Sequence, residues 1–377
     1  MNKYTYRVLK RRLGWLLKNN QVTRRLIQKH IEKRNALSYP ALLEYIETAD
    51  KIKIRKCDLR LGIVKDEDNL SFDLVPYWPK YERFARNNEL TYSLLDFHRE
   101  NWIEQAKNYD LIVWRPSSDP SVLYEQVSKT KYIEKVLNLR CYPSSDELWY
   151  YEDKLRVYYL LSSHNLPVIP AFITFSENEA FNKLDNLDYP VISKSNVGSS
   201  SFSIKKIKNR VVAKRYVRKA FSSGVDSGFP YMRQRGYIYF QKFIPDAAYD
   251  LRIIIVGKKI FGYYRMKPTN DFRASGAGLI KEGGELPLDV VKLALKAKEV
   301  MPGIMLAVDF LKPKNASSHL IIETSICISV SSPAQLRLGG IPGYYTLEDD
   351  KLVFHPGKYW LQELILEELI NNMTGDQ

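Results

Sequence analysis

Segments of strand length alternate with helical segments in the first half of the chain, and this alternation limits the possible folds more than any other feature. Residues 59–64 and 110–114 are typical of buried strands, whereas residues 81–88, 94–107 and 122–139 are typical of helices. Strands that alternate with helices favour a sheet of mostly parallel strands covered by helices. The sequence therefore predicts a small α/β domain here.

Strands dominate after a helix predicted over residues 153–164. A chain of 377 residues is long enough for two or three domains, and no apolar run reaches the roughly 20 residues of a membrane-spanning helix. Two further helices are expected over residues 288–300 and 359–371. The predicted strands cover residues 191–194, 202–207, 236–243, 251–256, 260–266, 305–311 and 319–325. This part of the chain is predicted to be α+β.

Most of the net charge of +14 lies near the N-terminus. Residues 1–60 carry 16 Lys and Arg against 5 Asp and Glu, which leaves a net charge of +3 for the rest. Residues 4–34 predict one or two amphipathic helices with a basic face. This face is either solvated while the apolar stripe packs on the body, or it contacts an anionic membrane or glycan. Nucleic acid is the least favoured partner, because no nucleic-acid-binding motif accompanies the charge.

Three widely spaced cysteines and five scattered histidines predict neither a disulfide framework nor a zinc site. A reducing cytoplasm is the expected location, with peripheral contact at the inner membrane surface through residues 1–34 as the open alternative. The oligomeric state is not predicted.

A lysine at a strand end precedes a loop of small residues. Such a loop lets backbone N–H groups approach an anion, and the lysine adds a positive charge for phosphate. Taken alone, the pattern fits an ordinary hairpin turn better than a phosphate site. The candidate phosphate-binding residues are Lys194, Ser195, Gly198, Ser199 and Ser200.

Two apolar strands each carry one carboxylate, Asp309 and Glu323. An isolated charge in such a strand is costly unless it is paired or bound to metal. The strands are joined by a short polar turn, so we expect a hairpin whose register places Asp309 opposite Glu323, with Cβ atoms about 5 Å apart. That spacing suits Mg²⁺, and Ser325 points to the same face. The alternative is a pair of edge carboxylates bonded to arginine or lysine.

Basic residues follow one another on or beside the strands between these two motifs. Arg252, Arg265, Lys267 and Arg273 could converge to stabilise phosphate or carboxylate charge. The alternative for each of them is a solvated strand face.

The order of these motifs resembles the ATP-grasp superfamily, in particular its RimK-type and glutathione-synthetase-like ligases. The resemblance covers about residues 110–330, with residues 59–110 similar to the small domain that precedes the grasp. The ordered residues are Lys154, Lys194, Gln241 to Pro245, Asp250, Arg252, Arg265, Asp271 to Ala274, Gly276, Gly278, Asp309 and Glu323. The resemblance implies a basic helical arm over 1–57, a pre-grasp α/β domain over 58–140 and two α+β lobes that clamp ATP, over 141–235 and 236–377.

The resemblance also implies a role for each site residue. Lys154 and Lys194 would hold phosphates, and Gln241, Lys242, Phe243 and Ile244 would run past the adenine. Arg252, Arg265 and Arg273 would face the γ-phosphate and the acyl group. Asp309, Glu323 and Ser325 would bind one or two Mg²⁺ ions. Ser325 stands where the family usually has Asn, so the second ion is expected to be bound weakly.

The implied reaction is ATP-dependent joining of a carboxylate to an amine through an acyl phosphate, with release of ADP. Phosphoryl transfer of this kind needs positioning and charge neutralisation rather than a protein nucleophile. The basic arm suggests an acidic glycan precursor, as in polysaccharide biosynthesis, or a peptide as substrate. Two alternatives stay open: a grasp-type kinase that phosphorylates a hydroxyl, and a nucleotide-binding adaptor without turnover.

Overall fold

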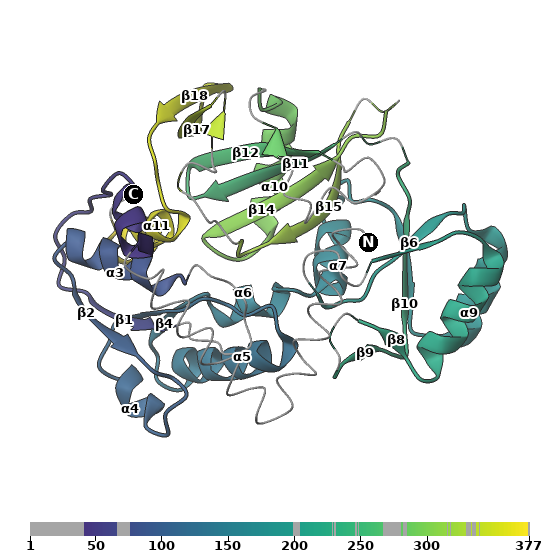
Figure 1. Cartoon of the computed structure of the whole chain (residues 1–377), viewed down its shortest axis with the longest axis horizontal. Coiled ribbons are helices and arrows are strands. Elements are labelled where there is room, and N and C mark those ends of the chain that lie inside the picture. The colour runs from purple at the N-terminus through teal and green to yellow at the C-terminus, as the bar shows by residue number, and fades with distance from the viewer. Residues whose placement is uncertain are drawn as a thin grey trace. The chain divides into compact units, whose positions relative to one another are not determined.

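The computed structural model describes residues 41–65, 76–198, 204–266 and 280–375, apart from gaps at 228, 230, 246, 248, 282–284, 315, 317, 329–332, 334–336 and 339. These residues form two compact units (Figure 1). The smaller unit contains Ile169–Pro245, and the larger unit contains Leu43–Val168 and Asp246–Gln377. The predicted arm over residues 1–34 lies outside the described residues, as do Ser199, Ser200, Lys267 and Arg273.

The larger unit begins with a parallel sheet in the order β2-β1-β3-β4. Its elements are β1 (Arg60–Val64), α3 (Trp78–Asn87), β2 (Thr91–Leu95), α4 (Trp102–Ala106), β3 (Leu111–Val113), α5 (Pro120–Lys135) and β4 (Arg140–Tyr142). The predicted parallel α/β arrangement is confirmed.

The helix predicted over residues 94–107 is wrong in its first part. Residues 91–95 pair in parallel with β1, with Leu94 beside Ile63, so backbone pairing to an existing strand overrides the local pattern. Only the last part of the prediction is helical, as α4.

The second sheet of the larger unit is built mainly from antiparallel strands in the order β15-β14-β11-β12-β17-β16. Helix 288–300 and the strands predicted over 251–256, 260–266, 305–311 and 319–325 are confirmed. The hairpin of β17 and β18 is not predicted by the sequence, because Pro342 and Gly343 interrupt its alternation. The elements are α6 (Ser145–Tyr150), α7 (Lys154–Ser163), β11 (Tyr249–Val256), β12 (Lys259–Met266), β13 (Ile280–Lys281), α10 (Leu288–Val300), β14 (Met305–Leu311), β15 (Leu320–Ser325), β16 (Arg337–Leu338), β17 (Ile341–Glu348), β18 (Lys351–Pro356) and α11 (Leu361–Thr374).

Strand β11 shows how this sheet separates apolar from charged side chains. Leu251, Ile253 and Ile255 point to one face and join the core that includes α10. Ile254 points to the other face and joins the core that includes α11. Arg252, two residues away, shares the face of Ile254 because side chains alternate along a strand. One face is therefore apolar where α11 covers it and charged toward the start of β11.

Helix α11 lies beside α3 of the first sheet, which ties the two sheets of this unit together (Figure 1). Arg83 of α3 donates from one terminal nitrogen to both carboxylate oxygens of Glu363 on α11, at 2.7 Å each. Both side chains are almost completely buried. The indole N–H of Trp360, also buried, donates to the carbonyl of Ile46 at 3.0 Å.

The smaller unit is an antiparallel sheet in the order β5-β10-β6-β7, with α9 on it (Figure 1). Phe240 of β10 packs in one core with Val217 of α9. The elements are β5 (Ala171–Thr174), α8 (Glu177–Lys183), the 3-10 helix η1 (Leu184–Asn186), β6 (Val191–Ser193), β7 (Lys205–Ile207), α9 (Arg210–Phe221), β8 (Val225–Asp226), β9 (Arg233–Gln234) and β10 (Ile238–Lys242). Within the described ranges of the whole chain, no helix is both long and apolar enough to cross a membrane.

Candidate functional site

Four charged side chains from three neighbouring strands form one cluster on the charged face of the large sheet. Strand pairing places Arg252 beside Asp309 and Asp250 beside Arg265. The guanidinium of Arg252 donates to both oxygens of Asp309, at 2.6 and 2.7 Å. A terminal nitrogen of Arg265 lies 2.6 Å from Asp309, and its Nε donates to Asp250. Asp309 is therefore held between two arginines.

The charges in this cluster depend on one another. Burial acts to raise the pKa of Asp309, but Arg252 and Arg265 outweigh it and hold this pKa below its usual range. Burial raises the pKa of Asp250 to about 6, against the attraction of Arg265. When both aspartates are ionised, their charges balance those of the two arginines.

Glu323 lies next to this cluster on the edge strand β15. The predicted register is confirmed, because Asp309 pairs with Glu323. A β-bulge follows between Asp309 and Phe310. Glu323 is half-buried, and its negative charge adds to the stabilisation of the Arg252 cation. The hydroxyl of Ser325 donates to the carbonyl of Cys327 and accepts from its N–H, so it is engaged with the backbone.

The oxygen ligands available here fit a hard divalent cation. The Glu323 carboxylate adds one negative charge to a cluster in which two aspartates, Asp250 and Asp309, already balance two arginines. Mg²⁺ is commonly held by one or two carboxylates together with substrate phosphates, so a larger protein cage is not required. Among the described residues, no group of three or more His, Cys, Asp or Glu could hold a metal. Asp309 and Glu323 are the carboxylates that would hold Mg²⁺ here, and Asp309 would share its oxygens with the two arginines.

The candidate phosphate loop of the smaller unit begins directly after β6. Lys194 is 2% exposed, and Ser195 next to it is 1% exposed. The Ser195 hydroxyl is buried and has no hydrogen-bond partner among the described residues. Asn196 is fixed by Tyr237, whose hydroxyl accepts from its backbone N–H and donates to its side chain. Gly198 has φ +113°, a backbone conformation that residues with a side chain rarely adopt.

The predicted adenine segment lies at the end of β10. Gln241 is buried and pairs with Ile192 of β6, whereas Lys242 is exposed. Phe243 and Ile244 follow the strand. The ammonium of Lys206 lies over the ring of Phe243, 3.9 Å from its centroid.

Lys154, the other predicted phosphate ligand, is the first residue of α7 in the larger unit. The side chain of Asp153 caps this helix by accepting from the N–H groups of Leu155 and Arg156.

Within the larger unit, the structure brings together Arg252, Arg265, Asp309 and Glu323, as the sequence predicts. The predicted roles of all site residues in binding remain predictions. The sequence alone does not identify Asp250 as the partner of Arg265. An observable signal existed, because Asp250 shares a strand face with Arg252 and lies close to Arg265 in any tight hairpin of β11 and β12.

Comparison with known sequences identifies similar proteins. Residues 151–334 match the RimK-like ATP-grasp domain family. The alpha-aminoadipate–LysW ligase LysX of Saccharolobus solfataricus is 24% identical over 67% of this chain and 89% of its own length. The glutamate–LysW ligase ArgX of Sulfurisphaera tokodaii is 22% identical over 60% of this chain and 78% of its own length.

Solved structures show the same fold at low sequence identity. A RimK domain protein with an ATP-grasp fold from Sphaerobacter thermophilus has a TM-score of 0.51 and is 14% identical, covering 72% of this chain and 92% of its own. The D-cycloserine synthetase DcsG has the same TM-score, identity and coverage.

Proposed function

Residues 151–334 form a RimK-like ATP-grasp domain, and on this premise we propose that the protein is an ATP- and Mg²⁺-dependent, ADP-forming carboxylate–amine ligase. The predicted ATP-grasp fold is confirmed by the family match and by the similar structures. ATP with Mg²⁺ is the cofactor pair of ATP-grasp ligases. The observation that carries the proposal is the cluster in which two arginines and two carboxylates meet beside Glu323 on one sheet face.

In the proposed reaction, an oxygen of the substrate carboxylate attacks the γ-phosphorus of ATP. The bond from this phosphorus to the β-γ bridging oxygen breaks, which gives an acyl phosphate and ADP. An amine then attacks the acyl carbon, inorganic phosphate leaves, and the amine loses a proton to give an amide. Mg²⁺ would supply positive charge at the phosphates, held by Asp309 and Glu323. Arg252 and Arg265 would neutralise charge on the transferred group.

The substrates are proposed by chemical class. The relatives LysX and ArgX are named as ligases that join alpha-aminoadipate or glutamate to LysW, which supports an amino acid as one of the two substrates. The other substrate is proposed to be the carboxylate of a peptide or of an acidic glycan. The basic character of residues 1–60 supports an acidic partner, because positive charge speeds encounter with anions.

Product analysis tests this function directly. Incubation with ATP, Mg²⁺, an amino acid and candidate peptide or glycan carboxylates should release ADP and phosphate in equal amounts, only when acid and amine are both present. AMP and pyrophosphate as products would contradict the acyl-phosphate route. A stable phosphorylated product formed without an amine would instead indicate a kinase, and nucleotide binding without any turnover would indicate an adaptor.

The role proposed for the basic arm is recruitment of an anionic surface or substrate. Deletion of residues 1–34 should weaken binding to vesicles that contain anionic lipid, or to an acidic glycan, while ATP affinity stays unchanged. Sedimentation with vesicles at low and high salt measures the first effect, and calorimetric titration with ATP measures the second. Equal vesicle binding with and without the arm would rule out recruitment by this segment.

A further inference from the structure

The strand that carries Glu323 lies at the edge of its sheet, so β14 is its one neighbouring strand among the described residues. β15 pairs with β14 on one side, and a bulge interrupts that pairing next to Asp309. On its outer side the beginning of β15 is held at Ile321, whose N–H donates to the carbonyl of Pro167 at 2.8 Å. The end of β15 needs a separate anchor if Glu323 is to stay in place.

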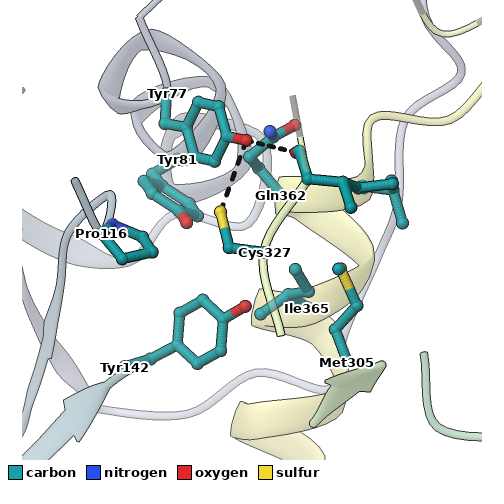
Figure 2. Close-up of a pocket in the computed structure, with 10 residues that line it drawn as sticks. Tyr77, Tyr81, Pro116, Tyr142, Met305, Cys327, Gln362 and Ile365 are labelled. Carbon is teal, nitrogen blue, oxygen red and sulfur yellow. Dashed lines mark hydrogen bonds between the residues drawn. The ribbon is translucent and has the colours of Figure 1, made fainter. Parts of the chain in front are cut away.

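Tyr77, the residue directly before α3, contacts the chain directly after β15. Its hydroxyl donates to the carbonyl of Ile328 and lies 3.6 Å from Sγ of Cys327. Figure 2 shows the ring of Tyr77 with its hydroxyl turned toward Cys327. Cys327 in turn is bonded to the Ser325 hydroxyl through its N–H and its carbonyl. A short chain of contacts thus runs from Tyr77 to Ser325, two residues from Glu323.

Tyr77 is itself firmly placed. It is 5% exposed, and the guanidinium of Arg115, which follows β3, lies 4.9 Å from its ring centroid. Burial raises the pKa of Tyr77 well above its usual range, so the hydroxyl keeps its proton and remains a donor.

The cavity beside this contact is too small for a substrate. Its volume is about 10 Å³, which is about the space of one water molecule. The hydroxyl-bearing side chains that line it include Tyr77, Tyr81 and Tyr142, together with the thiol of Cys327 (Figure 2). The contact is therefore suited to fix one segment against another rather than to bind a ligand.

We propose that Tyr77 is a positioning residue for the Mg²⁺ site, because its hydrogen bond to Ile328 holds the end of the edge strand that presents Glu323. The inference rests on the proposed function and adds to it a residue from the small α/β sheet region. Groups that orient metal ligands typically affect metal affinity by about 10–100-fold, although they do not touch the metal.

The test measures metal affinity rather than turnover. Mn²⁺ is titrated into the full-length protein in the presence of ADP, and free Mn²⁺ is followed by electron paramagnetic resonance. Tyr77→Phe should weaken Mn²⁺ binding by about tenfold. Tyr142→Phe removes another hydroxyl from the same cavity but keeps the hydrogen bond from Tyr77 to Ile328, and Cys327→Ala also leaves that bond in place. Both controls should bind Mn²⁺ within about twofold of the wild type.

Equal Mn²⁺ affinity of Tyr77→Phe and the wild type would overturn the positioning role while leaving the proposed function intact. A wild type whose Mn²⁺ binding is not strengthened by ADP would contradict the proposed function itself, and with it the inference.

Amide hydrogen exchange on the unmodified protein covers the case in which Tyr77→Phe does not fold. Mg²⁺ with ADP should slow exchange in peptides that cover residues 322–328 and also in those that cover 77–84. Slowing in the first segment alone would contradict a mechanical link through Tyr77. The hairpin of β17 and β18, which has no part in this contact, provides the internal reference.

Discussion

Replacement of Asp309 by alanine is expected to lower the free energy of unfolding by about 3–5 kcal/mol and to reduce turnover about a hundredfold or more. The stability loss follows because the substitution leaves Arg252 and Arg265 charged, with side chains only 16% and 11% exposed. An arginine cannot neutralise itself by losing its proton. Urea unfolding measures the first effect, and ADP release in the presence of both substrates measures the second.

Glu323→Gln is the matched control for this prediction. Glu323 shares the proposed metal site but is half-buried, and no ion pair involving it is present in the described part of the structure. We expect turnover to fall strongly, while the free energy of unfolding changes by no more than about 0.5–1 kcal/mol. Full turnover in either variant would contradict the assignment of that residue to the metal. A stable Asp309→Ala protein would contradict the buried pairing with two arginines.

Replacement of Glu363 by leucine is the second large effect and concerns stability alone. Arg83 and Glu363 are almost fully buried, and removal of the Glu363 carboxylate leaves the Arg83 cation with the exposed carboxylate of Glu47, 3.1 Å from its Nε, as its remaining ion-pair partner among the described residues. Breaking a buried pair from one side typically costs about 3–5 kcal/mol. Urea unfolding should show this loss, whereas Glu363→Gln should lose clearly less because its amide oxygen can still accept from Arg83. Equal losses in the two variants would mean that packing, rather than charge, dominates this contact.

The same pair predicts a pH dependence. Burial raises the pKa of Glu363 from 4.5 to about 7, despite the opposing attraction of Arg83. Between about pH 4.5 and 7 the folded protein therefore retains a proton that the unfolded chain has lost, so the contribution of this group to stability falls as pH rises through that window. Glu363→Gln should remove this component, seen as a smaller difference between unfolding free energies at pH 5 and pH 7.5. An unchanged difference would rule out Glu363 as its source.

The sequence predicts this fold well wherever a local pattern is sufficient. The length and apolar content of 305–311 and 319–325, with a short polar turn between them, predict both strands and the pairing of Asp309 with Glu323, which is confirmed. Prediction from the local pattern fails at residues 94–107. There, helical spacing competes with strand pairing to β1, and only the assembled sheet resolves that competition. Helix 288–300 is predicted within its observed bounds, because its apolar spacing matches the face it buries.

The immediate partners of the site residues are less accessible to sequence reasoning. Asp309 is predicted to bind a cation or to pair with a basic residue. The structure pairs it with Arg252 and Arg265, and this is compatible with sharing its oxygens with a metal. The sequence presents these basic residues as a series along neighbouring strands. It does not specify which carboxylate each one meets, because that depends on the relative register of three strands.

What the sequence determined by itself was the four strands that carry the charged cluster and Glu323, the opposition of two carboxylates across a hairpin and the motif order of an ATP-grasp domain. These depend on residues that are close along the chain or on periodicity that every strand must obey. Tertiary structure alone decided that Tyr77 meets Ile328 and that Arg83 meets Glu363, across separations of 251 and 280 residues. Contacts of this kind arise when whole elements dock, and neighbouring residues along the chain carry no pattern that specifies them.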